Sequence, residues 1–166
     1  MPRTNRFRVA AMLVGVAAAL LACAEKKKEA PAWRPAAGRL MTRWAAEVRP
    51  DNALPEYPRP QMVREKWLNL NGLWDYALVA RDASQPAQWD GQILVPFPVE
   101  SALSGVMKRV YETNQLWYRR TFTVPRGWKG KNVLLHFGAV DFETTVWVNG
   151  TEVGRHRGGY DAFTCD

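Results

Sequence analysis

The stretch that decides the fold reads Thr144-Thr145-Val146-Trp147-Val148, then Asn149-Gly150, then Thr151-Glu152-Val153. The β-branched and aromatic side chains on both sides of the central pair favour extended strands. Asn-Gly supplies the positive φ angles that a two-residue type I′ turn requires. We therefore predict a β-hairpin over residues 144–153.

Alternating apolar residues extend this prediction in both directions along the chain. Trp74, Tyr76 and Leu78 share one face of a predicted strand, with Asp75 and Ala77 on the other. Further strands are predicted over residues 93–97, 116–124 (ended by Pro125), 133–137 and 163–166. No apolar pattern between residues 61 and 166 repeats at the helical period over a convincing length. The pattern therefore predicts an all-β fold, an antiparallel β-sandwich or jelly roll.

The last residues indicate whether the predicted sandwich is complete. Phe163 to Asp166 reads as the opening of a strand. A sheet that stops in mid-strand leaves its neighbour's ladder unpaired, and natural proteins usually avoid such edges. We therefore expect the sandwich to be C-terminally incomplete, as the N-terminal piece of a longer product.

The N-terminus has the pattern of an export signal. Three arginines precede an uncharged run of fourteen residues, Val9 to Ala22, which is too short to span a bilayer comfortably. The following Leu20-Leu21-Ala22-Cys23 resembles the lipobox of bacterial lipoproteins, which predicts a signal peptide over residues 1–22 and lipidation of Cys23. The alternative is ordinary cleavage at Ala22-Cys23-Ala24. The protein is expected to be exported, as an outer-membrane lipoprotein or as a periplasmic or extracellular protein.

Charge and proline content divide the rest of the chain. The net charge of +7 arises entirely within residues 1–49, whereas residues 50–166 carry thirteen basic and thirteen acidic side chains. A balanced folded part does not favour a nucleic-acid groove, so no nucleic-acid partner is expected. Prolines punctuate the segment after the leader. We predict a lipid-anchored tether over residues 23–54 and a single domain over residues 55–166.

Several sequence blocks occur together in the predicted domain. They are residues 59–64 (RPQMVR) leading into 67–74 (WLNLNGLW), 93–101 (ILVPFPVES), 116–122 (LWYRRTF), 146–150 (VWVNG) and 158–163 (GGYDAF). In this order and spacing they resemble the N-terminal sugar-binding, jelly-roll-like (galactose-binding-like) domain of glycoside hydrolase family 2. That family includes β-galactosidases, β-glucuronidases and β-mannosidases.

The resemblance implies an enzyme whose chemistry lies elsewhere. Family members are retaining β-glycosidases with two catalytic glutamates in a later barrel domain, and one of these usually follows an asparagine. None of the seven asparagines here precedes a glutamate. We therefore expect no catalytic residue in this chain, a C-terminal barrel domain as its missing partner, and an oligo- or polysaccharide substrate for the parent enzyme. The alternatives are a non-catalytic carbohydrate-binding surface lipoprotein and a purely structural β-sandwich.

The resemblance also implies which residues approach the sugar. It singles out Glu100, Arg157, Tyr160 and Asp161, with capping and turn roles as the alternative for each. Gly158 occupies the place where the longer β-galactosidases carry an aspartate, and the Gly-Gly-Tyr sequence is more similar to the glucuronidase and mannosidase branches.

The remaining chemical side chains suggest structural roles. Two histidines and two cysteines without suitable spacing predict no metal and no cofactor. His136 is expected to be a structural histidine on a strand. Arg119 and Arg120 should point to opposite faces of their strand, one of them buried against a carboxylate. Four tryptophans are expected to fill the core from strands: Trp67, Trp74, Trp117 and Trp147.

Overall fold

The computed structural model describes residues 32–38, 40–57 and 64–166, and its compact unit begins at Trp33. The predicted signal peptide and Cys23 lie outside the described residues. The strands are β1 (Gly72–Ala80), β2 (Gly91–Val95), β3 (Asn114–Arg119), β4 (Leu135–Phe137), β5 (Glu143–Val148), β6 (Thr151–Arg157) and β7 (Phe163–Cys165). Short 3-10 helices are η1 (Arg43–Glu47), η3 (Ala102–Ser104) and η4 (Arg126–Trp128). Within the described ranges, no helix is long and apolar enough to cross a membrane.

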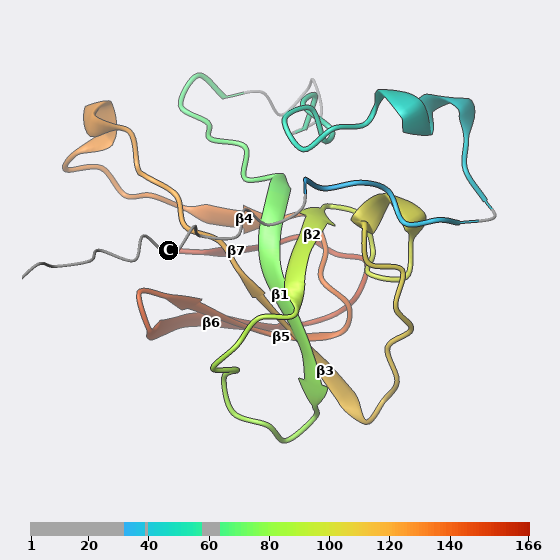
Figure 1. Cartoon of the computed structure of the whole chain (residues 1–166). Helices are drawn as coiled ribbons and strands as arrows, with labels where there is room; N and C mark the ends of the chain where they lie inside the picture. Colours follow the sequence, from blue (N-terminus) through green and yellow to red (C-terminus); the bar gives the residue numbers. More distant parts are fainter. Residues whose placement is uncertain (1–31, 39, 58–63) are drawn as a thin grey trace, which may run out of the picture. The chain divides into compact units, whose positions relative to one another are not determined.

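Every strand pair is antiparallel. β1 lies between β2 and β3, β4 pairs with β7, and β5 pairs with β6. Figure 1 draws the three-stranded sheet in front of the two smaller ones. The all-β antiparallel sandwich predicted from the alternating pattern is thus confirmed.

The central strand β1 is covered on both faces. Tyr76 lies on one face and packs with Ile93 and Val99 in a buried cluster. On the other face Ala77 is 1% exposed, and its cross-strand partner Trp117 stacks on Trp147 of β5 with ring centroids 5.2 Å apart. This stacking contact joins the three-stranded sheet to the β5–β6 sheet. A strand buried on both faces contributes more apolar burial than a half-exposed one.

The predicted hairpin is confirmed. Asn149 and Gly150 connect β5 to β6 with φ angles of 51° and 82°, as a type I′ turn requires. The register shifts between Val146 and Trp147, and such a bulge increases the local twist of the strand. The predicted strand opening at residue 163 is also present, because Phe163 pairs with Phe137 of β4.

The strand predicted over residues 116–124 is shorter in the structure. β3 ends at Arg119, and residues 120–125 have no strand structure. Nη1 of Arg120 donates to the carbonyls of Leu70, Asn71 and Leu73 at 2.9, 3.1 and 3.4 Å. The Arg120 side chain therefore binds carbonyls just before and at the beginning of β1, where pairing between β1 and β3 would otherwise continue.

The arginine prediction was also wrong in its detail. Arg119 is the residue with a carboxylate partner, Asp75 at 2.8 Å, and it is the exposed one of the two. Arg120, the less exposed, binds carbonyl oxygens instead. Backbone carbonyls accept from Nη1 of this guanidinium, and side-chain patterns do not reveal such partners.

The predicted core tryptophans also need correction. Trp74 and Trp117 are partly buried strand residues, but Trp147 is 46% exposed and Trp67 lies before β1 rather than on a strand. Trp67 stacks on the ring of His136 at 5.4 Å, and His136 Nδ1 lies 2.8 Å from the Thr164 hydroxyl. His136 therefore has the structural role expected of it.

Some described residues that precede the predicted domain contact the rest of the compact unit. The indole of Trp33 donates to the Ser104 carbonyl at 3.3 Å, and the amide of Ala36 donates to the Ala102 carbonyl at 2.8 Å. Ala45 in η1 is 4% exposed. Trp33, Ala36 and Ala45 therefore pack within the compact unit.

Candidate functional site

Three of the residues singled out from the sequence lie in the bend between β6 and β7. Arg157 ends β6, Tyr160 is fully exposed, and Asp161 lies with its carboxylate 3.4 Å from Nε2 of His156. The amide of Gly158 donates to the Phe142 carbonyl at 2.9 Å. The bend is therefore anchored to the segment before β5 while its tip remains accessible.

The bend has no room for a side chain at Gly158 or Gly159, because neighbouring carboxylates lie too close. A Cβ on Gly158 would collide with the Asp161 carboxylate, and the φ of Gly158 is +151°, a region that side chains rarely adopt. A Cβ on Gly159 would lie 2.6 Å from Oδ1 of Asp141. The Gly-Gly sequence thus lets two carboxylates approach the backbone of the bend.

Glu143 connects this bend to the end of β1. One of its oxygens lies 3.3 Å from Nε of Arg157, and the other lies 4.0 Å from Nη2 of Arg81. The guanidinium of Arg157 also lies over the ring of Phe142, 5.3 Å from its centroid. All of these charged groups are largely exposed, so the pairs position the side chains more than they stabilise the fold.

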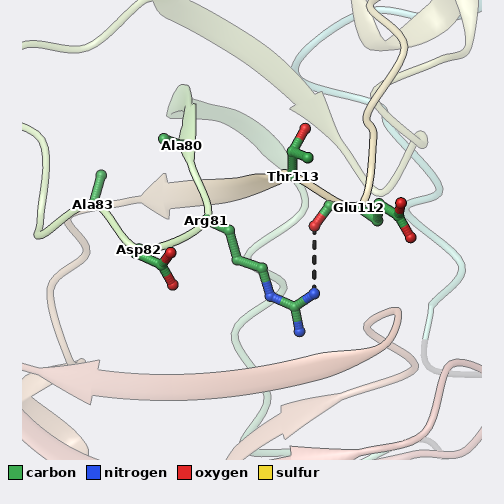
Figure 2. A pocket seen from close by; sticks show the side chains of 6 residues that line it. All are labelled: Ala80, Arg81, Asp82, Ala83, Glu112 and Thr113. Carbon is green, nitrogen blue, oxygen red and sulfur yellow. Dashed lines mark hydrogen bonds between the residues drawn. The ribbon is translucent and has the colours of Figure 1, made fainter.

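Arg81 lines an open hollow of about 620 Å³, which we call the Arg81 pocket (Figure 2). Its lining residues are Ala80, Arg81, Asp82, Ala83, Glu112 and Thr113. Nη1 of Arg81 reaches toward the Glu112 carbonyl at 3.4 Å, as the dashed line in Figure 2 marks. Sequence reasoning missed Arg81, because nothing marks an arginine in a turn as facing a hollow.

Glu100, the fourth predicted residue, lies outside the bend. Glu100 is exposed in the turn after β2. Burial, together with the negative charge of Glu100 and the neighbouring Tyr76, raises the pKa of Tyr118 to about 12. The structure therefore brings Arg157, Tyr160 and Asp161 together in one bend. Glu100 instead acts on Tyr118 of β3, whose pKa its charge helps to raise.

The arrangement supports binding rather than bond cleavage. Guanidinium, carboxylate and phenol groups offer donors and acceptors to hydroxyl-rich ligands, and Phe142 and Tyr160 add exposed aromatic surface. In the part of the chain that the structure describes, no group of three or more His, Cys, Asp or Glu side chains could hold a metal ion.

Comparison with known proteins identifies the family. Residues 91–166 match the sugar binding domain of glycosyl hydrolases family 2. A β-glucuronidase of Paenibacillus borealis is 30% identical over 116 residues, covering 66% of this chain and 19% of that protein. A β-glucuronidase of Streptococcus agalactiae serotype V is 26% identical over 107 residues, covering 64% and 18%.

A β-galactosidase of Thermoanaerobacter pseudethanolicus is 48% identical over a shorter stretch of 50 residues, which covers 30% of this chain and 7% of that protein. The chain thus spans less than a fifth of the length of these three curated relatives. The family match includes the strands from β2 to β7, the hairpin and the bend. Residues 91–166 therefore match the sugar-binding domain of glycosyl hydrolases family 2, the family that the sequence blocks predicted.

Proposed function

We propose that this chain is the sugar-binding part of a longer, exported retaining β-glycosidase, and that β-glucuronides are the substrates of that enzyme. Two relatives that match about two thirds of the chain are named β-glucuronidase, and the Gly-Gly-Tyr sequence of the bend is similar to the glucuronidase and mannosidase branches. In a retaining enzyme the two catalytic carboxylates are about 5 Å apart across the glycosidic bond. Those carboxylates belong to the barrel domain of the longer protein.

One observation supports a sugar-facing side on this domain. Glu143 holds Arg157 of the bend and Arg81 of the pocket through its two oxygens, so the bend and the Arg81 pocket form one continuous polar surface. We propose that this surface faces the substrate, with Arg81 and Arg157 donating to sugar hydroxyls and Tyr160 covering an apolar sugar face.

The test uses the product of the complete reading frame that encodes this chain. We expect hydrolysis of p-nitrophenyl β-glucuronide to exceed that of the β-galactoside and the β-mannoside. Arg81→Ala should lower kcat/KM about tenfold, which corresponds to roughly 1.4 kcal/mol of lost interaction. Arg126→Ala, which removes an exposed arginine from η4, is the matched control and should leave kcat/KM unchanged.

Other outcomes decide among the alternatives. Faster turnover of another glycoside would contradict the substrate class, and equal losses in both arginine variants would contradict the sugar-facing surface. If no glycoside is hydrolysed, a glycan array separates the remaining functions. Binding would then indicate a carbohydrate-binding lipoprotein, whereas an array without any response would indicate a structural sandwich.

We further propose that the protein is exported and anchored by lipid on Cys23. Each buried methylene of an acyl chain contributes about 0.8 kcal/mol to membrane binding, so several chains anchor a protein durably. We expect labelled palmitate to enter the wild type and Cys165→Ser but not Cys23→Ser. Cys165 is buried and serves as the matched cysteine control. Label that persists in Cys23→Ser would contradict the anchor.

A further inference from the structure

A second hollow of about 190 Å³ lies on the three-stranded sheet, and none of its lining residues lines the Arg81 pocket. We call it the Arg120 pocket. Its lining residues are Leu73, Asp75, Gln92, Arg119, Arg120 and Thr121. Gln92, Asp75 and Arg119 are direct cross-strand neighbours on β2, β1 and β3, so they form one row on the same face of the sheet. A hollow of this size has room only for a small ligand.

The negative charge in this row is already compensated. Nε and Nη2 of Arg119 both donate to Oδ2 of Asp75, at 3.1 and 2.8 Å. The guanidinium of Arg119 also lies over the ring of Trp89, 4.4 Å from its centroid. Asp75 and Arg119 therefore contribute no net charge to the pocket, and among the described residues Nη1 of Arg119 donates no hydrogen bond.

The positive charge of Arg120 is not compensated. Within the described residues, its side chain donates hydrogen bonds from Nη1 alone, and all of them go to backbone carbonyls. Across residues 32–38, 40–57 and 64–166, no carboxylate forms an ion pair with it, and its Nε and Nη2 donate no hydrogen bond. Burial lowers the pKa of Arg120, although the guanidinium stays protonated. An anion beside Nε and Nη2 would accept from donors that no described residue uses, and would balance the charge.

We propose that the Arg120 pocket binds a small oxyanion, the carboxylate of a sugar acid or a free inorganic phosphate. Arg120 supplies the net charge and a planar pair of donors that matches two oxygens. Gln92 and Thr121 line the pocket, and an amide and a hydroxyl can donate to the same anion. Arg119 is held in place by Asp75 and Trp89, so the site changes little on binding.

The experiment is calorimetric titration of the whole chain with sodium glucuronate, sodium phosphate and glucose at constant ionic strength. We expect saturable binding of at least one anion and none of glucose. Stronger binding of glucuronate would identify a sugar acid as the ligand, and stronger binding of phosphate would identify the free ion. Binding of neither anion, or equal binding of glucose, would overturn the proposal. Because no hydrolysis is measured, the result is independent of the proposed glycosidase activity.

Charge variants localise the site. Gln92→Glu places a negative charge in the pocket and should weaken anion binding at least about tenfold. Gln85→Glu makes the same charge change at an exposed position outside the pocket lining and should leave binding within about twofold. If Gln92→Glu loses its cooperative thermal melt, Thr121→Asp introduces the charge from another side of the pocket. Unchanged affinity in a folded pocket variant would overturn the proposed site.

Discussion

Leu94→Ala is expected to lower the free energy of unfolding by about 2–5 kcal/mol. Leu94 is 0% exposed in β2, where it pairs with Leu73 of β1. Truncation removes buried methyl groups and leaves a cavity between close-packed neighbours. Urea unfolding of the purified chain followed by circular dichroism measures the change through the transition midpoint.

Leu134→Ala is the matched control for this prediction. The same atoms are removed from a side chain that is 49% exposed, so the expected change is within about 1 kcal/mol. Equal shifts of the two midpoints would contradict the assignment of Leu94 to the core. A chain without a cooperative transition would contradict a packed sandwich altogether.

Gly158→Ala should disrupt the bend after β6 and lower the free energy of unfolding by about 2–6 kcal/mol. A side chain at φ +151° is strained, which costs about 1–3 kcal/mol. The added Cβ would also collide with the Asp161 carboxylate and lie 3.2 Å from Nε2 of His156, which adds an overpacking cost of similar size. Thermal melts report the stability, and the signal of Phe163 in NMR spectra reports whether β7 stays paired.

Two other glycines separate the two causes. Gly130 has φ +75° and no atom within 4 Å of an added Cβ, so Gly130→Ala measures backbone strain without a collision. Gly127 lacks both features, and Gly127→Ala should be nearly neutral. In the Gly158→Ala chain, Asp161→Ala should restore part of the stability by removing the collision. Equal effects of all three glycine variants would show that the bend needs no glycine.

Local signals predicted those parts of the fold that depend on local physics. The Asn149-Gly150 turn is fixed by φ angles that few residues adopt, and its prediction holds to the residue. The end of β3 was not predictable, because the alternation continues past Arg119 while Arg120 donates to the carbonyls of Leu70 and Leu73. Such a contact joins positions about fifty residues apart.

The candidate site was likewise predicted only in part from the sequence. The bend could be found from its sequence block, but the Arg81 pocket could not, because Arg81 meets Glu143 only through the arrangement of the sheets. The contacts of Trp33 and Ala36 with η3 were not predicted for a related reason. Small buried residues such as Ala45 and Ala53 produce no periodic pattern.

The rings that follow the bend have a consequence for ligand binding. His156 stacks on Phe163 at 4.3 Å, and Phe163 stacks on Phe137 at 4.7 Å, so three rings from β6, β7 and β4 form a column. These stacked rings hold both ends of the bend that carries Tyr160. Fixing both ends reduces the conformational entropy that the backbone of the bend can still lose. If Tyr160 contacts a sugar as proposed, less backbone ordering would oppose binding.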